Sequence, residues 1–297
     1  ASIYGQSGSE NNAPDTLASA GTASAAGEAI APAAPVLAQP LDTRKIGRAA
    51  EVRLGFTTLV RDHALLWSSP FRARRSALKT VLPLLGATAA AFALDHHVAK
   101  GLPNTPDQVR YSKAVSVFGT DYSLAAASGV FLAAGAVTHN RHAVETGLLA
   151  VQALAHTESI AQMLKFAAGR ERPDFGEDGP GRFWHRQQSF PSGHAMSTWA
   201  VATVISREYH QNRFIRYGIF AFPIVISAAR LGGQRHFLSD VVAGGSIGYL
   251  VGGWIYDRHH DPALGGAPIH RRGWSVTPDV QYDPASRGVG VSLKLTR

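Results

Sequence analysis

Residues 189–196 read Ser-Phe-Pro-Ser-Gly-His-Ala-Met, and an apolar run from Ala195 to Ile205 follows directly. This run predicts a helix, which places the turn Pro191–His194 at a helix N-terminus. Such a turn offers backbone N–H groups without helical partners, a hydroxyl, a glycine that lets a ligand come close, and an imidazole. Because these groups suit a phosphate-like anion, we expect an anion-binding site at this turn.

Two other stretches supply positive charge to this site. Lys165 precedes Arg172-Pro173 by seven positions, and Gly169 indicates that the helix ends between them and turns Arg172 toward the site. Arg230 lies downstream. Arginine binds phosphate oxygens bidentately and lysine adds a point charge, although any one of these cations alone is most often a solvated surface group. The predicted phosphate-binding residues are Lys165, Arg172, Ser192, Gly193 and Arg230.

Two histidines carry the predicted chemistry. His236 and Asp240 are spaced i, i+4, so on one helical turn the carboxylate can hold one ring nitrogen and leave the other free as a nucleophile. His194 is then the second imidazole, which can protonate a leaving oxygen. A lone His–Asp pair is more often a packing or capping interaction, so the assignment depends on all three stretches meeting. The predicted substrate entrance is the loop with Trp184, His185 and Arg186, for which an ordinary exposed loop is an equal alternative.

Composition and periodicity predict an all-α fold. The chain has 297 residues, no cysteine and a formal charge of +8, which excludes disulfides and thiolate metal sites and favours anionic partners. Length favours helix over strand in six apolar stretches. They are roughly Ala77–Val98, Tyr122–His139, Ala143–Phe166, Ala195–Arg207, Phe214–Arg230 and Ser239–Tyr256. In the last stretch, Gly244, Gly248 and Gly252 recur every fourth residue and predict close approach of another helix.

The chain is predicted to have four parts. Residues 1–41 are rich in Ala, Ser, Gly and Pro and should be disordered. Residues 42–75 should form an amphipathic helix and a linker, with the helix packed on the domain or lying on a membrane surface. The helical catalytic domain spans 76–260, including a short linking helix at Gln108–Phe118. Alternating apolar residues predict a C-terminal β-hairpin after a linker within 261–297.

The three stretches, taken together and in this order, resemble the type 2 phosphatidic acid phosphatase family. This family shares its site with bacterial class A acid phosphatases and vanadium haloperoxidases, and the resemblance covers about residues 77 to 258. It implies a six-helix bundle and a hydrolysis in two steps without a metal cofactor. In it, His236 would become a phosphohistidine, Asp240 would orient it, and His194 would act as acid and then as base. Ala229 stands where the family commonly has serine, which we expect to tune activity.

The leading hypothesis is therefore a phosphatase for lipid phosphates or related envelope phosphomonoesters and diphosphates. A vanadate-dependent haloperoxidase is the alternative enzyme, and only then would a cofactor, vanadate, be required. A non-catalytic anion- or lipid-binding envelope protein is the alternative from another class. The expected partners are a phosphorylated lipid or small phosphoester and an anionic membrane surface, not nucleic acid.

Two features of the sequence disagree about the membrane. The uncharged runs of 16–17 residues are short for a span, which favours a soluble bundle. If the helices alternate in direction, however, basic residues collect at the end opposite the site, as in a membrane protein with an exported site. Six spans would place both termini in the cytoplasm, whereas Ala1 suggests a processed, exported N-terminus. The sequence slightly favours a soluble or membrane-associated envelope protein with its site facing the periplasm.

Overall fold

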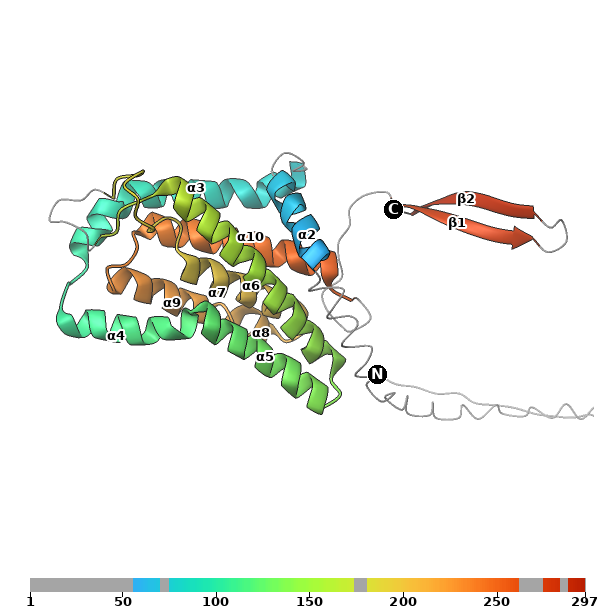
Figure 1. Cartoon of the computed structure of the whole chain (residues 1–297), viewed down its shortest axis with the longest axis horizontal. Coiled ribbons are helices and arrows are strands. Elements are labelled where there is room, and N and C mark those ends of the chain that lie inside the picture. The colour runs from blue at the N-terminus through green and yellow to red at the C-terminus, as the bar shows by residue number, and fades with distance from the viewer. Residues whose placement is uncertain (1–55, 70–74, 174–180, 262–274, 284–287, 297) are drawn as a thin grey trace, which may run out of the picture. The chain divides into compact units, whose positions relative to one another are not determined.

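The computed structural model describes residues 56–69, 75–173, 181–261, 275–283 and 288–296 (Figure 1). The predicted disordered tail, the start of the helix predicted from residue 42 and the linker after residue 261 lie outside these residues. The described helices are α2 (Phe56–Ser68), α3 (Arg75–Gly101), α4 (Pro106–Ser116), η2 (Val117–Gly119), α5 (Asp121–Val137), α6 (Arg141–Ala168), α7 (Gly193–Glu208), α8 (Arg213–Gly218), α9 (Ala221–Gly232) and α10 (Leu238–His259). The predicted all-α class is confirmed for the catalytic region.

Two strands follow the helical region in the sequence. Strands β1 (Ser275–Asp283) and β2 (Gly288–Thr296) pair antiparallel, with Ser275 opposite Thr296 and Asp283 opposite Gly288. They occupy the range in which the alternating pattern predicted a hairpin.

One predicted helix is interrupted. The stretch predicted as Phe214–Arg230 forms α8 and α9, separated at Ile219 and Phe220. Pro223 explains the break, because it has no N–H to donate to the carbonyl of Ile219 and its ring would clash with that carbonyl. Asn212 begins α8 by accepting hydrogen bonds from two backbone N–H groups of its first turn.

The glycine stripe on α10 brings that helix directly against α7, as the sequence predicted. A Cβ at Gly244, Gly248 or Gly252 would overlap the backbone of α7, at the carbonyl oxygens of Ser192, Met196 and Ala200 respectively. The two backbones therefore touch along this seam, with no side chain between them. This contact places the Pro191–His194 turn beside the start of α10, where His236 lies.

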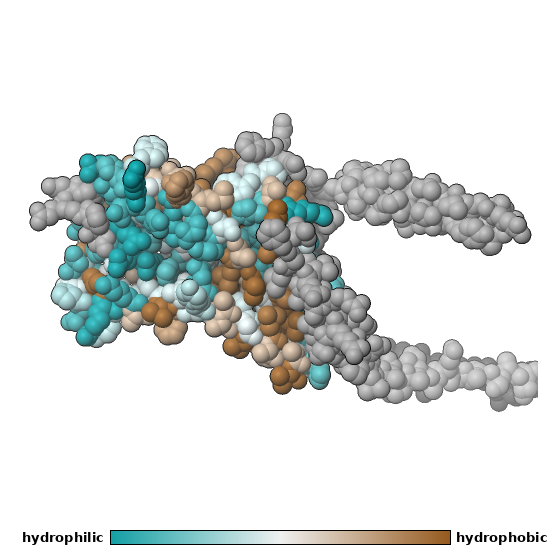
Figure 2. All heavy atoms as spheres, in the orientation of Figure 1, coloured by the Kyte–Doolittle hydropathy of each residue, from teal (hydrophilic) through white to brown (hydrophobic). Residues whose placement is uncertain are grey.

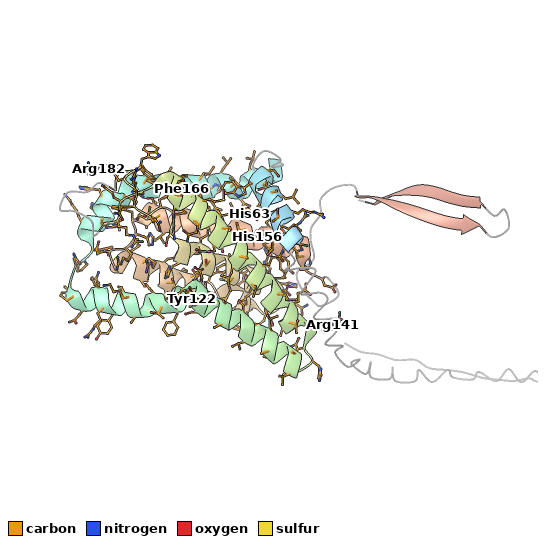
Figure 3. All side chains as sticks on the ribbon, in the orientation of Figure 1. His63, Tyr122, Arg141, His156, Phe166 and Arg182 are labelled. Carbon is orange, nitrogen blue, oxygen red and sulfur yellow. The ribbon has the colours of Figure 1, made fainter. Side chains whose placement is uncertain are left out.

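Helix α2 is attached to the bundle through Asp62. This carboxylate is buried and accepts hydrogen bonds from Gln152 on α6 and from Arg258 at the end of α10. Beside it, the His63 ring stacks on the His156 ring with centroids 5.6 Å apart (Figure 3). These contacts favour the scaffold interpretation of the amphipathic helix over the membrane-surface one.

The preference for a soluble bundle, drawn from the length of the uncharged runs, is corrected by the structure. Three helical segments are long and apolar enough to cross a membrane: Ala77–Gly101, Arg213–Gly232 and Leu238–His259. The bent pair α4–η2 and α5 would supply a fourth if it is one span. The length of the uncharged runs underestimated the length of the apolar helices, because a charged residue near a helix end can extend to the membrane surface without shortening the helix.

The exposed surface agrees with membrane association. Only 6% of the apolar window in the first of these segments is buried within the protein, and Leu82 and Leu85 on α3 are each 59% exposed. Figure 2 shows hydrophilic residues gathered at the end of the domain that carries α4, and hydrophobic residues over α5 and its surroundings. A bare apolar helix of this length is stable in lipid rather than in water, so the protein is membrane-associated.

Candidate active site

A cavity of about 340 Å³ lies where the three predicted stretches meet. Its lining includes Arg172 from the segment after α6, His194 from the first turn of α7 and Arg230 from the last turn of α9. Helix α6 ends at Ala168 with Gly169 in the left-handed conformation (φ 52°), which confirms the predicted helix end and leaves Arg172 on the following loop. Residues more than fifty positions apart in the sequence therefore share one site.

The two arginines are arranged to receive an anion. The Nε atoms of Arg172 and Arg230 are both buried, and neither has a hydrogen-bond partner in the part of the chain that the structure describes. A buried guanidinium N–H without an acceptor is costly, so its retention indicates that a ligand supplies the acceptor. Lys165 adds a third positive charge beside Gly193: a Cβ built on this glycine would lie 3.2 Å from the Lys165 Nζ.

His194 lies among these positive charges. The pKa of His194 is lowered to about 3, first by burial and then by the charges of Arg230, His236, Lys165 and Arg172. Burial also lowers the pKa of Lys165, while Glu158 and Asp121 raise it and Arg172 and Arg230 lower it. Beyond burial, the neighbouring cations thus disfavour the protonated form of His194, and a bound phosphate dianion would offset their effect.

His236 is held by a different partner from the predicted one. Its Nδ1 lies 2.7 Å from the backbone carbonyl oxygen of Ser189, whereas the nearest oxygen of Asp240 is 3.7 Å away. The i, i+4 argument assumed one helix, but α10 begins at Leu238, so His236 lies before the helix. The carbonyl can only accept, and it therefore fixes the proton on Nδ1 and leaves Nε2 as the nitrogen with a free lone pair.

Asp240 supports this arrangement indirectly. Its carboxylate is fully buried and accepts hydrogen bonds from the hydroxyl of Ser189 at 2.5 Å and the backbone N–H of Phe237 at 2.8 Å. Asp240 therefore holds Ser189, whose carbonyl accepts from the His236 ring, and also Phe237, which follows His236 in the chain. We expect the negative charge of Asp240 to stabilise a positively charged His236 from 3.7 Å.

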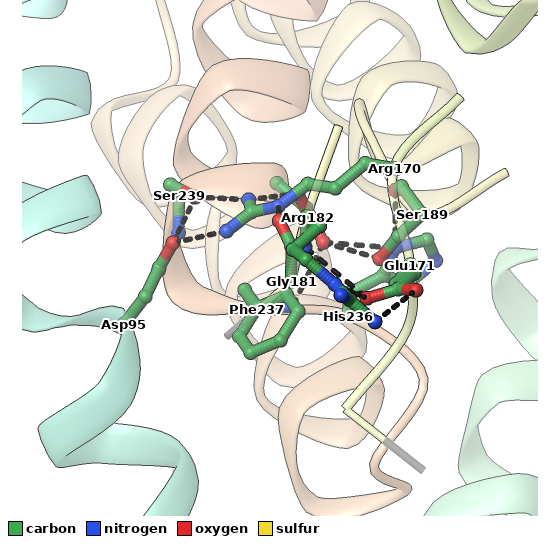
Figure 4. A network of polar contacts seen from close by, with 10 residues as sticks. Asp95, Arg170, Glu171, Gly181, Arg182, Ser189, His236, Phe237 and Ser239 are labelled. Atoms are coloured by element: carbon green, nitrogen blue, oxygen red, sulfur yellow. Dashed lines mark hydrogen bonds and ion pairs between the residues drawn. The ribbon is translucent and has the colours of Figure 1, made fainter. Parts of the chain in front are cut away.

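The structure adds a buried network that the motifs did not reveal (Figure 4). Arg170 donates from Nη1 to Asp240 at 2.6 Å and from Nη2 to Asp95 on α3 at 2.7 Å. Asp95 also accepts from the backbone N–H of Ser239 at 2.8 Å. Three aromatic rings lie about the Arg170 guanidinium, and the ring of Phe237 is 4.4 Å away. Arg170 and Asp95 thus link α3 and the segment after α6 to the first turn of α10.

Replacing Asp95 by Asn should test this positioning role. The substitution keeps the size of the side chain but leaves Arg170 with one buried carboxylate partner, so we expect about 3 kcal/mol lower stability and about tenfold lower kcat at unchanged KM. Melting in detergent and steady-state kinetics measure the two effects. Asp107→Asn is the matched control, because Asp107 forms only an exposed ion pair with Arg110 and should change neither quantity. Equal behaviour of the two variants would contradict the role.

Ser192 and Gly193 lie at the predicted turn, with both residues buried. The Ser192 hydroxyl accepts from the backbone N–H of Ala195 at 3.5 Å and so caps α7. The backbone N–H of Ser192 donates to the backbone carbonyl of Asp240 at 2.9 Å. The second contact ties the turn to α10. Phosphate binding by the Ser192 hydroxyl and the Gly193 N–H stays a prediction.

The predicted entrance differs from the observed cavity lining. Trp184, His185 and Arg186 do not line the cavity, and Trp184 is 82% exposed. Their loop is instead hydrogen-bonded back onto the end of α6, with the N–H of Trp184 donating to Ala168 at 2.8 Å. The other wall of the cavity comes from α4 and η2, a region that none of the motifs covers. It contributes Lys113, Ser116, Val117 and Thr120.

The chain is also similar in sequence to known proteins. Residues 146–262 match the model of the PAP2 superfamily. Over 98 residues the chain is 33% identical to lipid A 1-phosphatase of Porphyromonas gingivalis, a stretch that covers 31% of this chain and 20% of that protein. The chain therefore matches about a fifth of the length of this relative.

Two solved structures show likeness to the chain. One is a transmembrane PAP2-type phosphatidylglycerolphosphate phosphatase from Bacillus subtilis, with TM-score 0.46 and 19% identity over 60% of this chain and 92% of that one. The other is LpxE from Aquifex aeolicus, with TM-score 0.42 and 21% identity over 55% of this chain and 92% of that one.

Proposed function

With residues 146–262 belonging to the PAP2 superfamily, we propose that this protein is a membrane-associated phosphatase that hydrolyses lipid phosphates through a phosphohistidine intermediate. The observation that carries the proposal is that Arg172 and Arg230, which line the same cavity as His194, each have a buried Nε without a partner among the described residues. Three cations and two imidazoles supply the charge and the acid–base groups that phosphoryl transfer needs.

In the first step, His236 Nε2 attacks phosphorus while the bond between phosphorus and the leaving oxygen breaks. His194 gives its proton to that oxygen, so the leaving group departs as a neutral alcohol. The Nδ1–H of His236 keeps its hydrogen bond to Ser189 O throughout, and Asp240 stabilises the positive charge on the phosphorylated ring. Lys165, Arg172 and Arg230 hold the phosphoryl oxygens.

In the second step, the now neutral His194 accepts a proton from water, whose oxygen attacks phosphorus. The bond between phosphorus and His236 Nε2 breaks, phosphate is released, and both histidines return to their initial state. No step requires a metal ion, because the fixed cations neutralise the charge of the phosphoryl group.

The lipid preference follows from the exposed apolar helices, which place the cavity on a protein that lies in a membrane. We assign the site to the periplasmic face of a bacterial envelope. The supporting observation is the position of basic residues: Arg141 lies at the opposite end of α6 from Phe166, the residue next to Lys165 (Figure 3), and Arg207 and Arg258 lie in the last turns of α7 and α10. Basic residues at the end away from the site favour a cytoplasmic position for that end.

The function can be tested by measuring phosphate release from phosphatidic acid, an isoprenyl diphosphate and p-nitrophenyl phosphate, each with and without EDTA. We expect turnover of the lipids in detergent micelles and no effect of EDTA. Absence of phosphate release from all three substrates would refute the proposal. Peroxide-dependent halide oxidation after vanadate loading would identify the haloperoxidase instead, and anion binding without turnover would identify the non-catalytic alternative.

Binding of a dianion should be accompanied by proton uptake. His194 is neutral at pH 7 in the free protein, because its pKa is about 3. A bound dianion offsets the neighbouring cations and raises this pKa, so affinity increases as pH falls through the pKa of the complex toward that of the free site. Calorimetry with tungstate in two buffers of different ionisation enthalpy measures the uptake. His194→Ala should bind tungstate without it, and uptake unchanged in that variant would contradict the assignment.

A further inference from the structure

The cavity contains more positive charge than a single phosphoryl group requires. Four cationic side chains line it: Lys113, Arg172, Arg230 and Arg235. Arg172 and Arg230, together with Lys165, already bring three positive charges to a phosphomonoester dianion. Lys113 on α4 and Arg235, which follows α9, add two more. No aspartate or glutamate lines the cavity in the part of the chain that the structure describes.

Lys113 also joins this cavity to a second one. A neighbouring cavity of about 470 Å³ is lined by Asn104, Pro106, Val109, Arg110 and Lys113. Lys113 is the residue that the two cavities share, so a substituent leaving the phosphoryl site toward α4 would pass its ammonium group. Val109 and Pro106 make this wall partly apolar. Arg110 on the same wall forms an ion pair with Asp107 at 3.6 Å.

The Lys113 side chain has no ion pair or hydrogen bond with the residues that the structure describes, and it is exposed. It can therefore meet an anion without breaking an existing contact. Arg235 directly precedes His236 in the sequence and lines the same cavity as Arg230, whose pKa its charge helps to lower. Two cations that line the cavity beyond the phosphoryl-binding set, one of them shared with the neighbouring cavity, favour a second anionic group.

We propose that Lys113 and Arg235 form a subsite for a second anionic group of the substrate, adjacent to the phosphoryl group that is removed. This inference rests on the proposed function and narrows its substrate class to lipid diphosphates and to lipid phosphates that also carry a phosphodiester. Lys113 and Arg235 would then be specificity-determining residues, whereas Lys165, Arg172 and Arg230 serve every substrate.

A matched pair of substrates tests the subsite. An isoprenyl diphosphate and the corresponding isoprenyl monophosphate, in the same micelles, differ only in the second phosphate. For Lys113→Ala we expect kcat/KM to fall about tenfold for the diphosphate and less than about twofold for the monophosphate. Lys113→Arg should keep most of the preference. Lys100→Ala is the control, because Lys100 is also exposed but lines neither cavity.

Binding without turnover gives an independent measurement. Inorganic pyrophosphate should inhibit the wild-type protein more strongly than inorganic phosphate, and Lys113→Ala should remove most of this difference. Arg235→Lys, which retains the charge but not the bidentate geometry, should lower the ratio of kcat/KM for the diphosphate to kcat/KM for the monophosphate.

The outcomes separate the subsite from the proposed function. Equal losses on both isoprenyl substrates in Lys113→Ala would overturn the subsite, since they would show a general field effect, and leave the phosphatase assignment standing. A wild-type protein that hydrolyses neither substrate would refute the phosphatase assignment. In that case the difference between pyrophosphate and phosphate binding still decides whether the subsite exists.

Discussion

His236→Ala should lower phosphate release by about 10⁴-fold or more, because the variant lacks the nitrogen that forms the covalent intermediate. His236 is 5% exposed, and its Nδ1 is fixed by the Ser189 carbonyl at 2.7 Å. We therefore expect no other side chain to replace it as the nucleophile. Steady-state phosphate release in detergent measures the loss. His97→Ala is the matched control, since His97 is exposed on α3 and lies outside the cavity lining.

The intermediate itself can be trapped in His194→Ala. With p-nitrophenyl phosphate the leaving group needs no proton, so the first step proceeds, whereas the second step lacks its base and slows by about 10²- to 10⁴-fold. Labelled phosphate should therefore accumulate on His194→Ala, in an acid-labile and base-stable form, and should be absent from His236→Ala and from the double variant. Label that persists on His236→Ala, or phosphate release at the wild-type rate, would refute the nucleophile assignment.

Gly248→Ala should have the largest effect on folding. A Cβ at this position would overlap the carbonyl oxygen of Met196 and the backbone around it, and a backbone cannot move aside as a flexible side chain can. We expect a loss of about 3 kcal/mol or more in stability, with activity falling in parallel, because the contact between α7 and α10 sets the position of His194 relative to His236, which lies just before α10. Thermal melting in detergent and phosphate release measure both effects.

Gly86→Ala is the control for the same chemical change. Gly86 lies within α3, and a Cβ there meets no atom within 4 Å. Alanine also has the higher helix propensity, by roughly 0.5–1 kcal/mol in soluble helices, so this variant should melt at or above the wild-type temperature. A Gly248→Ala protein that melts like Gly86→Ala would show that the close contact of the two helices is not needed.

Much of the site could be predicted from local patterns. The turn at residues 191–194, the end of α6 at Gly169 and the glycine stripe on α10 each depend on residues close in sequence, and each was predicted correctly. The same holds for the helical type of the six apolar stretches, although the break between α8 and α9 was not predicted. These features are local because capping, backbone conformation and helix packing act within one or two turns.

The remaining features depend on contacts between distant segments. Asp95 and Arg170 are 75 residues apart, and no spacing rule connects them. The partner of His236 is a backbone carbonyl, which any residue at position 189 would supply, so its identity leaves no mark in the sequence. In the sequence, Lys113 does not differ from any other exposed helical lysine, and only the position of α4 beside the cavity distinguishes it. In each case the position is set by packing of the whole bundle rather than by local propensity.

The direct contact between α7 and α10 affects how the protein responds to the thickness of the membrane. Outer helices can tilt as bilayer thickness changes, because lipid fills the space beside them. Two helices in direct main-chain contact cannot slide past one another in this way, so we expect His194 at the start of α7 and His236 just before α10 to keep their relative positions. If the proposed function holds, we expect activity to change little between thin and thick membranes.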